Sequence, residues 1–175
     1  MANLINFYLK INNTISKLAN KSYDLIALGL RYWVFSVFFW SGWLKLSSWQ
    51  PTIFLFTYEF NVTWLPLPPP LVEYLGVTIP SFSPTLAAYS GTAAEILLPL
   101  FIIIGFGARI PAIMLFIFNY VAVASYPFLW TDVGLAGFKD HIIWGLVIAF
   151  IMLRGPGKIS LDHLLHKFKC QNYRY

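Results

Sequence analysis

Residues 85–109 read TLAAYSGTAAEILLPLFIIIGFGAR, and the apolar part of this stretch is about twenty residues long, enough to cross the hydrocarbon core of a bilayer. One acidic residue, Glu95, lies near its middle. The stretch ends at Gly105, Gly107 and Arg109, which predicts a sharp turn beside a positive charge. A carboxylate at membrane depth is costly and seldom lacks a partner or a task. We therefore ask which residue faces Glu95.

The composition is that of a membrane protein. Of 175 residues, 58% are hydrophobic and 11% are charged, whereas soluble domains carry about 25% charged residues. The aromatic share of 19%, with seven Trp and ten Tyr, suits a chain that lines two bilayer interfaces. Together with the length and the hydrophobic periodicity of the chain, these values predict an all-α integral membrane four-helix bundle, with amphipathic N-terminal and C-terminal helices.

The basic residues are distributed unevenly, and they orient the predicted bundle. The net charge of +5 does not indicate nucleic-acid binding, because nearly all Lys and Arg fall on one predicted side of the membrane. The other side holds only Lys45 and Lys139. The positive-inside rule then predicts that both termini are cytoplasmic. The residues on the basic side are Lys10, Lys17, Lys21, Arg109, Arg154, Lys158, Lys167, Lys169 and Arg174.

The predicted elements follow the hydrophobic periodicity. We expect an amphipathic interfacial helix over residues 1–23, whose apolar residues recur at alternating spacings of four and three. A helix docked on the bundle or on a partner is the alternative. The four spans are predicted at about 24–46, 84–104, 110–130 and 138–154, followed by a basic cytoplasmic tail over 155–175. The outer loop, 47–83, contains PLPPP at 66–70, which predicts polyproline geometry without regular helix.

Three polar residues are predicted to share one layer of the bundle. Arg31 lies seven residues, and Glu95 and Asn119 each nine residues, from the predicted cytoplasmic ends of their spans. We therefore predict an intramembrane ion pair between Arg31 and Glu95, with Asn119 or Tyr120 as a further partner. Such a pair can simply fix helix register. It can also form a site that handles protons or binds a ligand between the helices.

A second polar cluster is predicted at the outer mouth, beneath the 47–83 loop. It contains Lys45, Lys139, Asp140 and His141, with Asp132 nearby. Ordinary interfacial charge at helix ends is one interpretation. The other is a site in which His141 carries protons, since histidine changes charge near neutral pH. No metal site is predicted: His163 and His166, three residues apart, are better explained as part of a solvated helix face.

The order and spacing of several short motifs resemble the DoxX family. These are Arg31, the segment FFWSGWLKL with Gly42 and Lys45, the segment AAE ending at Glu95, and GFGAR over Gly105 to Arg109. The resemblance implies a small four-span membrane protein of the bacterial inner (cytoplasmic) membrane. It places the family's characteristic Arg, Lys, Glu and Arg on Arg31, Lys45, Glu95 and Arg109. Ser41 stands where family members often have His.

The resemblance also implies redox chemistry, because the family includes a subunit of a thiosulfate:quinone oxidoreductase. The leading hypothesis is therefore a membrane subunit that binds a quinone, with no covalently bound cofactor. A protein partner would deliver electrons, since the sequence shows no haem, iron–sulfur, flavin or dithiol motif. A transporter or exporter element that acts as an oligomer, and a non-catalytic scaffold for soluble partners, remain alternatives. Besides the lipid bilayer, we expect a protein partner or a homo-oligomer.

Overall fold

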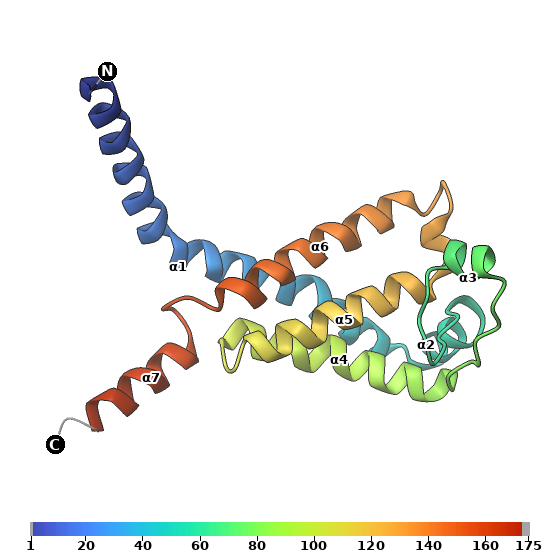
Figure 1. Cartoon of the computed structure of the whole chain (residues 1–175). Coiled ribbons are helices and arrows are strands. Elements are labelled where there is room, and N and C mark those ends of the chain that lie inside the picture. The colour runs from blue at the N-terminus through green and yellow to red at the C-terminus, as the bar shows by residue number, and fades with distance from the viewer. Residues whose placement is uncertain (1, 173–175) are drawn as a thin grey trace.

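The computed structural model is a bundle of four long helices, and it describes the backbone of residues 2–172 and the side chains of residues 4–169. Figure 1 shows the outer loop capping one end of the bundle, while the two terminal helices leave from the opposite end. The predicted all-α membrane fold is confirmed, and the described residues contain no strand beyond one isolated bridge between Thr63 and Ser81. The bundle helices are α1 (Ala2–Ser47), α4 (Pro84–Ile104), α5 (Arg109–Ser125) and α6 (Leu135–Arg154).

Of the described helices, three are long and apolar enough to cross a bilayer, namely α1, α4 and α6. The protein is therefore a multi-pass membrane protein. The fourth, α5, is apolar but has 17 residues. The segment predicted as one span over 110–130 divides into α5 and a 3₁₀ helix, η2 (Pro127–Trp130). The division falls at Tyr126, with φ −109° and ψ 93°, because a residue that precedes proline is disfavoured in helical conformation.

The terminal helices differ from the predicted arrangement in their boundaries. Residues 2–23 of the expected interfacial helix and the span expected over 24–46 form one continuous helix, α1, and Met1 lies outside the described residues. In Figure 1 its N-terminal part turns away from the bundle.

The bundle helix α6 also begins earlier than predicted. The span expected from residue 138 begins at Leu135, directly after Gly134. A side chain at Gly134 would overlap the backbone of Phe128, so only glycine permits this tight entry into α6.

The outer loop contains regular structure. It forms α2 (Trp49–Phe54), a π-helical turn η1 (Leu55–Glu59) and α3 (Pro69–Leu75). The expectation that 66–70 lacks regular helix is therefore wrong from Pro69 onward, because proline suits the first position of a helix. Pro68, just before α3, does have polyproline-like angles, with φ −56° and ψ 138°.

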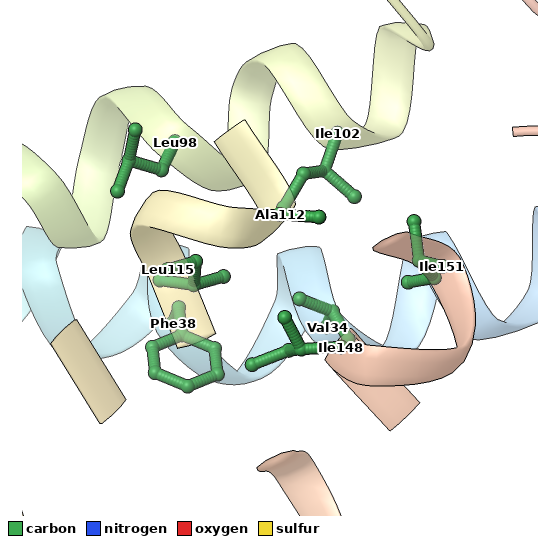
Figure 2. Packing of buried hydrophobic residues seen from close by; sticks show 8 residues of the cluster. All are labelled: Val34, Phe38, Leu98, Ile102, Ala112, Leu115, Ile148 and Ile151. Carbon is green, nitrogen blue, oxygen red and sulfur yellow. The ribbon is translucent and has the colours of Figure 1, made fainter. Parts of the chain in front are cut away.

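We call the end of the bundle at which α4 ends and α5 begins the inner end. The hydrophobic core occupies the half of the bundle next to this end. All four bundle helices contribute to it, and Figure 2 shows their side chains meeting between the ribbons. Apolar packing is dense there, with Ile102, Leu115 and Ile148 fully buried. The remaining half, towards the loop, holds a second, smaller apolar cluster around Phe56, Ala87 and Ala88 and several polar side chains. The core residues are Val34, Phe38, Leu98, Ile102, Ala112, Leu115, Ile148 and Ile151.

Candidate functional site

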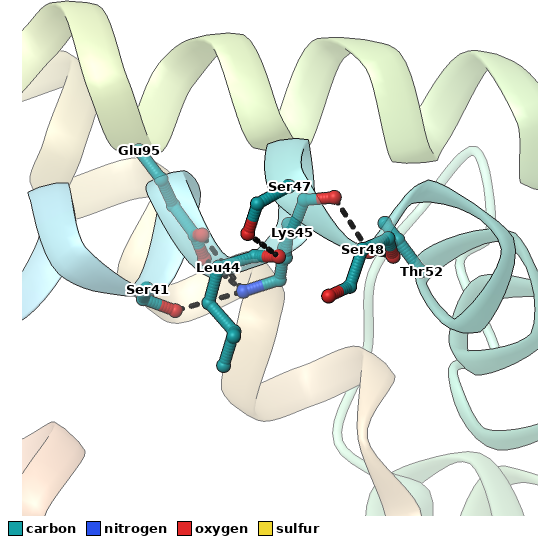
Figure 3. A network of polar contacts seen from close by, with 7 residues as sticks. All are labelled: Ser41, Leu44, Lys45, Ser47, Ser48, Thr52 and Glu95. Carbon is teal, nitrogen blue, oxygen red and sulfur yellow. Dashed lines mark hydrogen bonds and ion pairs between the residues drawn. The ribbon is translucent and has the colours of Figure 1, made fainter.

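Glu95 is paired with Lys45. The Lys45 ammonium donates to both carboxylate oxygens, with Nζ–Oε2 2.7 Å and Nζ–Oε1 3.0 Å. It also donates to Ser41 Oγ at 2.8 Å, one helical turn earlier in α1 (Figure 3). The Lys45 side chain is only 16% exposed and the Glu95 side chain only 11%. Each charge thus has the paired, hydrogen-bonded partner that a low-dielectric site requires.

Gly42 allows α1 and α4 to approach closely enough for this pair to form. A Cβ atom built on Gly42 would lie 2.8 Å from Glu95 Cβ and 2.8 Å from Ile96 Cγ1. Any side chain here would push the two helices apart. Small residues at helix interfaces let backbones approach closely in membranes. Gly42 therefore acts as the contact point that sets α1 against the turn of α4 carrying Glu95.

The predicted ion pair between Arg31 and Glu95 is wrong. Arg31 is fully buried, and its guanidinium caps the C-terminal end of α4, donating from Nη1 to Ile103 O at 3.0 Å and Ile102 O at 3.4 Å. Its Nη2 donates to Ile159 O. The last carbonyls of a helix lack intrahelical donors and carry partial negative charge, so they are good partners for a cation.

The register between α1 and α4 explains this outcome. The two helices run in opposite directions, and Gly42 faces Glu95. Moving eleven residues back along α1 gives Arg31, and moving ten residues forward along α4 gives Gly105. A Cβ on Gly105 would indeed lie 2.6 Å from Arg31 Nη1. Arg31 thus belongs to the inner end, and the predicted common layer of Arg31, Glu95 and Asn119 does not exist.

Asn119 instead pairs with His141 across the contact between α5 and α6. Asn119 Nδ2 donates to the backbone oxygen of His141 at 3.0 Å, while Asn119 Oδ1 lies 2.8 Å from His141 Nδ1. Because the amide nitrogen is already committed as a donor, Oδ1 must accept, and Nδ1 carries the proton in this arrangement. Gly145 leaves room for the contact, since its Cβ would lie 3.3 Å from Asn119 Nδ2.

The remaining predicted residues are more scattered. Tyr120 is exposed and its hydroxyl donates to Pro66 O in the outer loop at 3.0 Å, away from Glu95. Lys139 and Asp140 lie on the exposed surface of α6. Arg109 begins α5 at the inner end, where a Cβ on Gly155 would approach its Nε at 3.3 Å. Of the predicted outer-mouth residues, Lys45 and His141 are the two that reach the interior together.

Two cavities adjoin the ion pair. The first, which we call the bundle cavity, has a volume of about 310 Å³, and its polar lining includes Ser41, Lys45, Glu95 and His141. The second, the loop cavity, has a volume of about 270 Å³ and lies beneath the outer loop. Lys45 and Glu95 line both cavities, as do Phe60, Phe118 and Ala122.

Aromatic side chains form much of the walls of the bundle cavity. Trp144 packs edge-on against His141, with ring centroids 4.7 Å apart, and against Phe38 at 5.7 Å. Phe60 stacks on Tyr126 at 4.7 Å. The site therefore combines a charged pair on one wall, an imidazole on another and ring-shaped apolar surfaces between them. Such a site suits a flat ligand that carries polar atoms at its edge.

Sequence reasoning missed several residues of this site. Ser41 departs from the family pattern, and its spacing of four from Lys45, which places both on one face of a helix, is the signal that identifies it. Phe60, Phe118 and Trp144 carry no signal that separates them from the many other aromatic residues of the chain. Phe60 reaches the site because the loop folds back over the bundle, while Phe118 and Trp144 come from α5 and α6 and reach it through helix packing.

The site residues could accommodate a quinone but show no arrangement for a metal. Within the described part of the chain, no group of three or more His, Cys, Asp or Glu side chains is placed to hold a metal ion. A quinone ring offers two carbonyl oxygens as hydrogen-bond acceptors. In the bundle cavity the Lys45 ammonium can donate to one of them, whereas the His141 ring can donate only from a protonated Nε2, because its Nδ1 proton faces Asn119 Oδ1.

Comparison with known proteins identifies a family. The DoxX family model matches residues 26–128, which include Arg31, Lys45, Glu95, Arg109 and Asn119 and end before α6. No curated protein and no solved structure matches the chain. The matched segment covers more than half of the sequence and contains the ion pair together with the glycine contact that forms it. The chain therefore belongs to the DoxX family.

Proposed function

We propose that this protein is the membrane subunit of a quinone-linked redox system, with the quinone ring held in the bundle cavity beside the Lys45–Glu95 pair. The observation that carries this proposal is the convergence of Lys45, Glu95 and His141 on one aromatic-walled cavity. The three residues come from α1, α4 and α6, so the folded bundle is needed to bring them together.

The cavity suits a ligand of this class in size and polarity. Its volume of about 310 Å³ lies near the lower end of ligand pockets, which span roughly 300–1,000 Å³. That volume matches a single substituted ring rather than a long molecule. Phe60, Phe118 and Trp144 supply flat apolar surface, while Lys45 supplies a donor that orients a carbonyl group.

Each polar residue has a distinct task in this proposal. A bound quinone accepts two electrons and two protons. Lys45 would donate a hydrogen bond to one carbonyl oxygen, and Glu95 and Ser41 hold the ammonium in place. His141, held by Asn119, would serve the other edge of the ring as proton carrier. A soluble partner, from thiol, thiosulfate or oxidant-defence metabolism, would supply the electrons.

A lipid-soluble ligand also has a route to the site. A groove of about 380 Å³ lies between α5 and α6, with Phe116, Tyr120, Ile142 and Leu146 among its apolar lining residues. His141 and Asn119 line this groove, and His141 lines the bundle cavity as well. This shared wall supports lateral entry of the ring from the membrane past His141.

The proposed location is the bacterial inner membrane, with both termini in the cytoplasm. The inner end of the bundle carries most of the Lys and Arg residues, while the outer loop carries Glu59 and Glu73 and no basic residue. This asymmetry favours a cytoplasmic inner end under the positive-inside rule. Arg174, which the charge count from sequence includes, lies outside the described residues.

The test is direct identification of bound molecules. Wild type, Glu95→Gln and Lys45→Met would be purified in mild detergent, and their lipid-soluble extracts compared by mass spectrometry. We expect about one quinone per protein in wild type and at least a tenfold loss in both variants. Glu73→Gln, on the exposed α3, is the matched control and should retain quinone. Thermal unfolding of each variant separates loss of ligand from loss of fold.

A different outcome would redirect the functional assignment. Quinone absent from wild type, or retained in both pair variants, contradicts the proposal. If wild type contains no quinone, the transporter and scaffold hypotheses are favoured instead. Flux in proteoliposomes that depends on Glu95 would then support a transporter, and capture of soluble partners that depends on the terminal helices would support a scaffold.

A further inference from the structure

Two helical arms leave the inner end of the bundle with their apolar residues exposed. The N-terminal arm is residues 4–23 of α1, and the C-terminal arm is α7 (Leu161–Asn172) (Figure 1). In the N-terminal arm, Leu4 is 79% and Leu18 65% exposed. The other members of its apolar face are Tyr8, Ile11 and Ile15, and in the C-terminal arm Leu164, Leu165 and Phe168 are exposed in the same way.

The position of each arm is determined by its connection to the bundle. At about 1.5 Å per residue, the 46 residues of α1 measure about 69 Å, more than twice a hydrocarbon core of about 30 Å. The N-terminal arm therefore begins where α1 leaves the membrane. The C-terminal arm is anchored at the same level, because Asp162 accepts from Gly107 N at 2.7 Å and Ala108 N at 3.2 Å.

The inner end and its arms are strongly basic. In the described part of the chain they carry nine Lys or Arg residues and two acidic ones, Asp24 and Asp162. Both carboxylates accept backbone N–H groups, Asp24 from Lys158 N at 2.7 Å. The rest of the described chain has two Lys and five Asp or Glu residues. The exposed apolar faces of the two arms thus lie at the positive end of the molecule.

Within each arm the charges flank the apolar face. Lys10, Lys17 and Lys21 recur at spacings of seven and four, which places them together on one flank of the N-terminal arm. Lys167 and Lys169 lie on opposite sides of the C-terminal apolar face. An apolar face bordered by lysines is the pattern of a helix that lies in the headgroup layer, its lysines reaching the phosphates.

We propose that both arms bind the anionic phospholipid headgroups of the leaflet at the inner end, forming a two-armed clamp on the membrane that the bundle spans. The charge of the arms indicates that an anionic leaflet, and not another copy of the chain, covers their apolar faces. Two copies would bring like-charged arms together, whereas each lysine near an anionic leaflet is attracted to it. The leaflet is also the apolar surface closest to an arm that continues a membrane-spanning helix. This proposal does not depend on the quinone hypothesis.

Spin-label accessibility in full-length protein tests the clamp. In a Cys170→Ser background, single labels at Ile11 on the apolar face and at Asn13 on the opposite face would be compared. The protein would be placed in nanodiscs of phosphatidylcholine alone, or with phosphatidylglycerol. In anionic discs we expect the Ile11 label to be accessible to oxygen and shielded from a nickel chelate, and the Asn13 label to show the reverse. A matched pair at Leu165 on the apolar face and His163 on the opposite face reads out the C-terminal arm.

Charge variants complete the test. Replacing Lys10, Lys17 and Lys21 by Gln should weaken partition of the N-terminal arm by about a hundredfold, since each surface lysine contributes about fivefold. The Ile11 label should then become accessible to the nickel chelate. Lys139→Gln on the opposite end is the control and should change nothing. Equal accessibility at Ile11 and Asn13 in anionic discs overturns the proposal, as does an unchanged Ile11 label in the triple variant. A label shielded from both reagents only at high protein concentration identifies a second copy instead.

Discussion

Gly42 of α1 lies directly against Glu95 of α4, so closely that a Cβ on Gly42 would be 2.8 Å from the Cβ of Glu95. Because Gly42 has no side chain, α1 approaches α4 closely, and this approach decides which residue of α1 pairs with Glu95. With α1 this close, Lys45 lies one turn further along and reaches Glu95 at 2.7 Å. The glycine and the ion pair form one structural unit.

Substitution of this glycine should separate the two helices. We expect Gly42→Ala to lower the free energy of unfolding by about 1–3 kcal/mol, the usual cost of overpacking. Its contacts include the α4 backbone at 3.1 Å, which cannot rotate away. Gly29→Ala in the same helix is the control, because no atom lies within 4 Å of its Cβ. That change should be neutral or stabilise by up to about 1 kcal/mol. Equal effects in detergent unfolding would contradict the close contact.

The two charges should depend on each other. Lys45→Met or Glu95→Gln alone leaves a largely buried partner without its counter-charge, which we expect to cost about 3 kcal/mol. The double variant removes the unpaired charge, so its cost should be at least about 1 kcal/mol less than the sum of the two. A double-mutant cycle on reversible unfolding measures this coupling. Additive effects would show that the pair does not interact energetically.

Arg31 should act on the inner end and leave the candidate site unchanged. Arg31→Gln removes the guanidinium that joins the end of α4 to Ile159. A hydrogen bond to a charged group contributes about 1.5–3 kcal/mol, so we expect amide exchange in 105–109 and 158–162 to rise at least tenfold. Exposed Arg154→Gln is the control. Because Arg31 lines neither the bundle cavity nor the loop cavity, Arg31→Gln should retain bound quinone. Loss of quinone from this variant would show that Arg31 belongs to the site.

Asn119 should hold His141 in one tautomer. In wild type at a pH where the ring is neutral, ¹⁵N NMR should show the proton on Nδ1, facing Asn119 Oδ1 at 2.8 Å. Asn119→Leu removes the acceptor, and we expect a mixture of the two tautomers. Tyr120→Phe removes only the bond to Pro66 O and should leave the histidine spectrum unchanged. A wild-type ring protonated on Nε2 would contradict the proposed orientation of the pair.

The apolar segments and the two ends of α4 could be predicted from the sequence because both depend on local chemistry. About twenty apolar residues must span a bilayer as a helix, since lipid offers no partner for a free backbone group. Gly105 ends α4 with φ +72°, a conformation that glycine adopts readily. The start of α6 could not be predicted as well, because Gly134 fits only against the backbone of Phe128, which is a tertiary contact.

The sequence by itself determined that an intramembrane carboxylate needs a cationic partner, and it limited the candidates on α1 to Arg31 and Lys45. These two residues are fourteen apart, four helical turns, so both occupy one stripe of the helix. Periodicity cannot choose between them. They lie about 21 Å apart along the axis, and Glu95 can reach only one. The tertiary structure made that choice through the register of α1 on α4, which the contact at Gly42 sets because two backbones can approach this closely only where a side chain is absent.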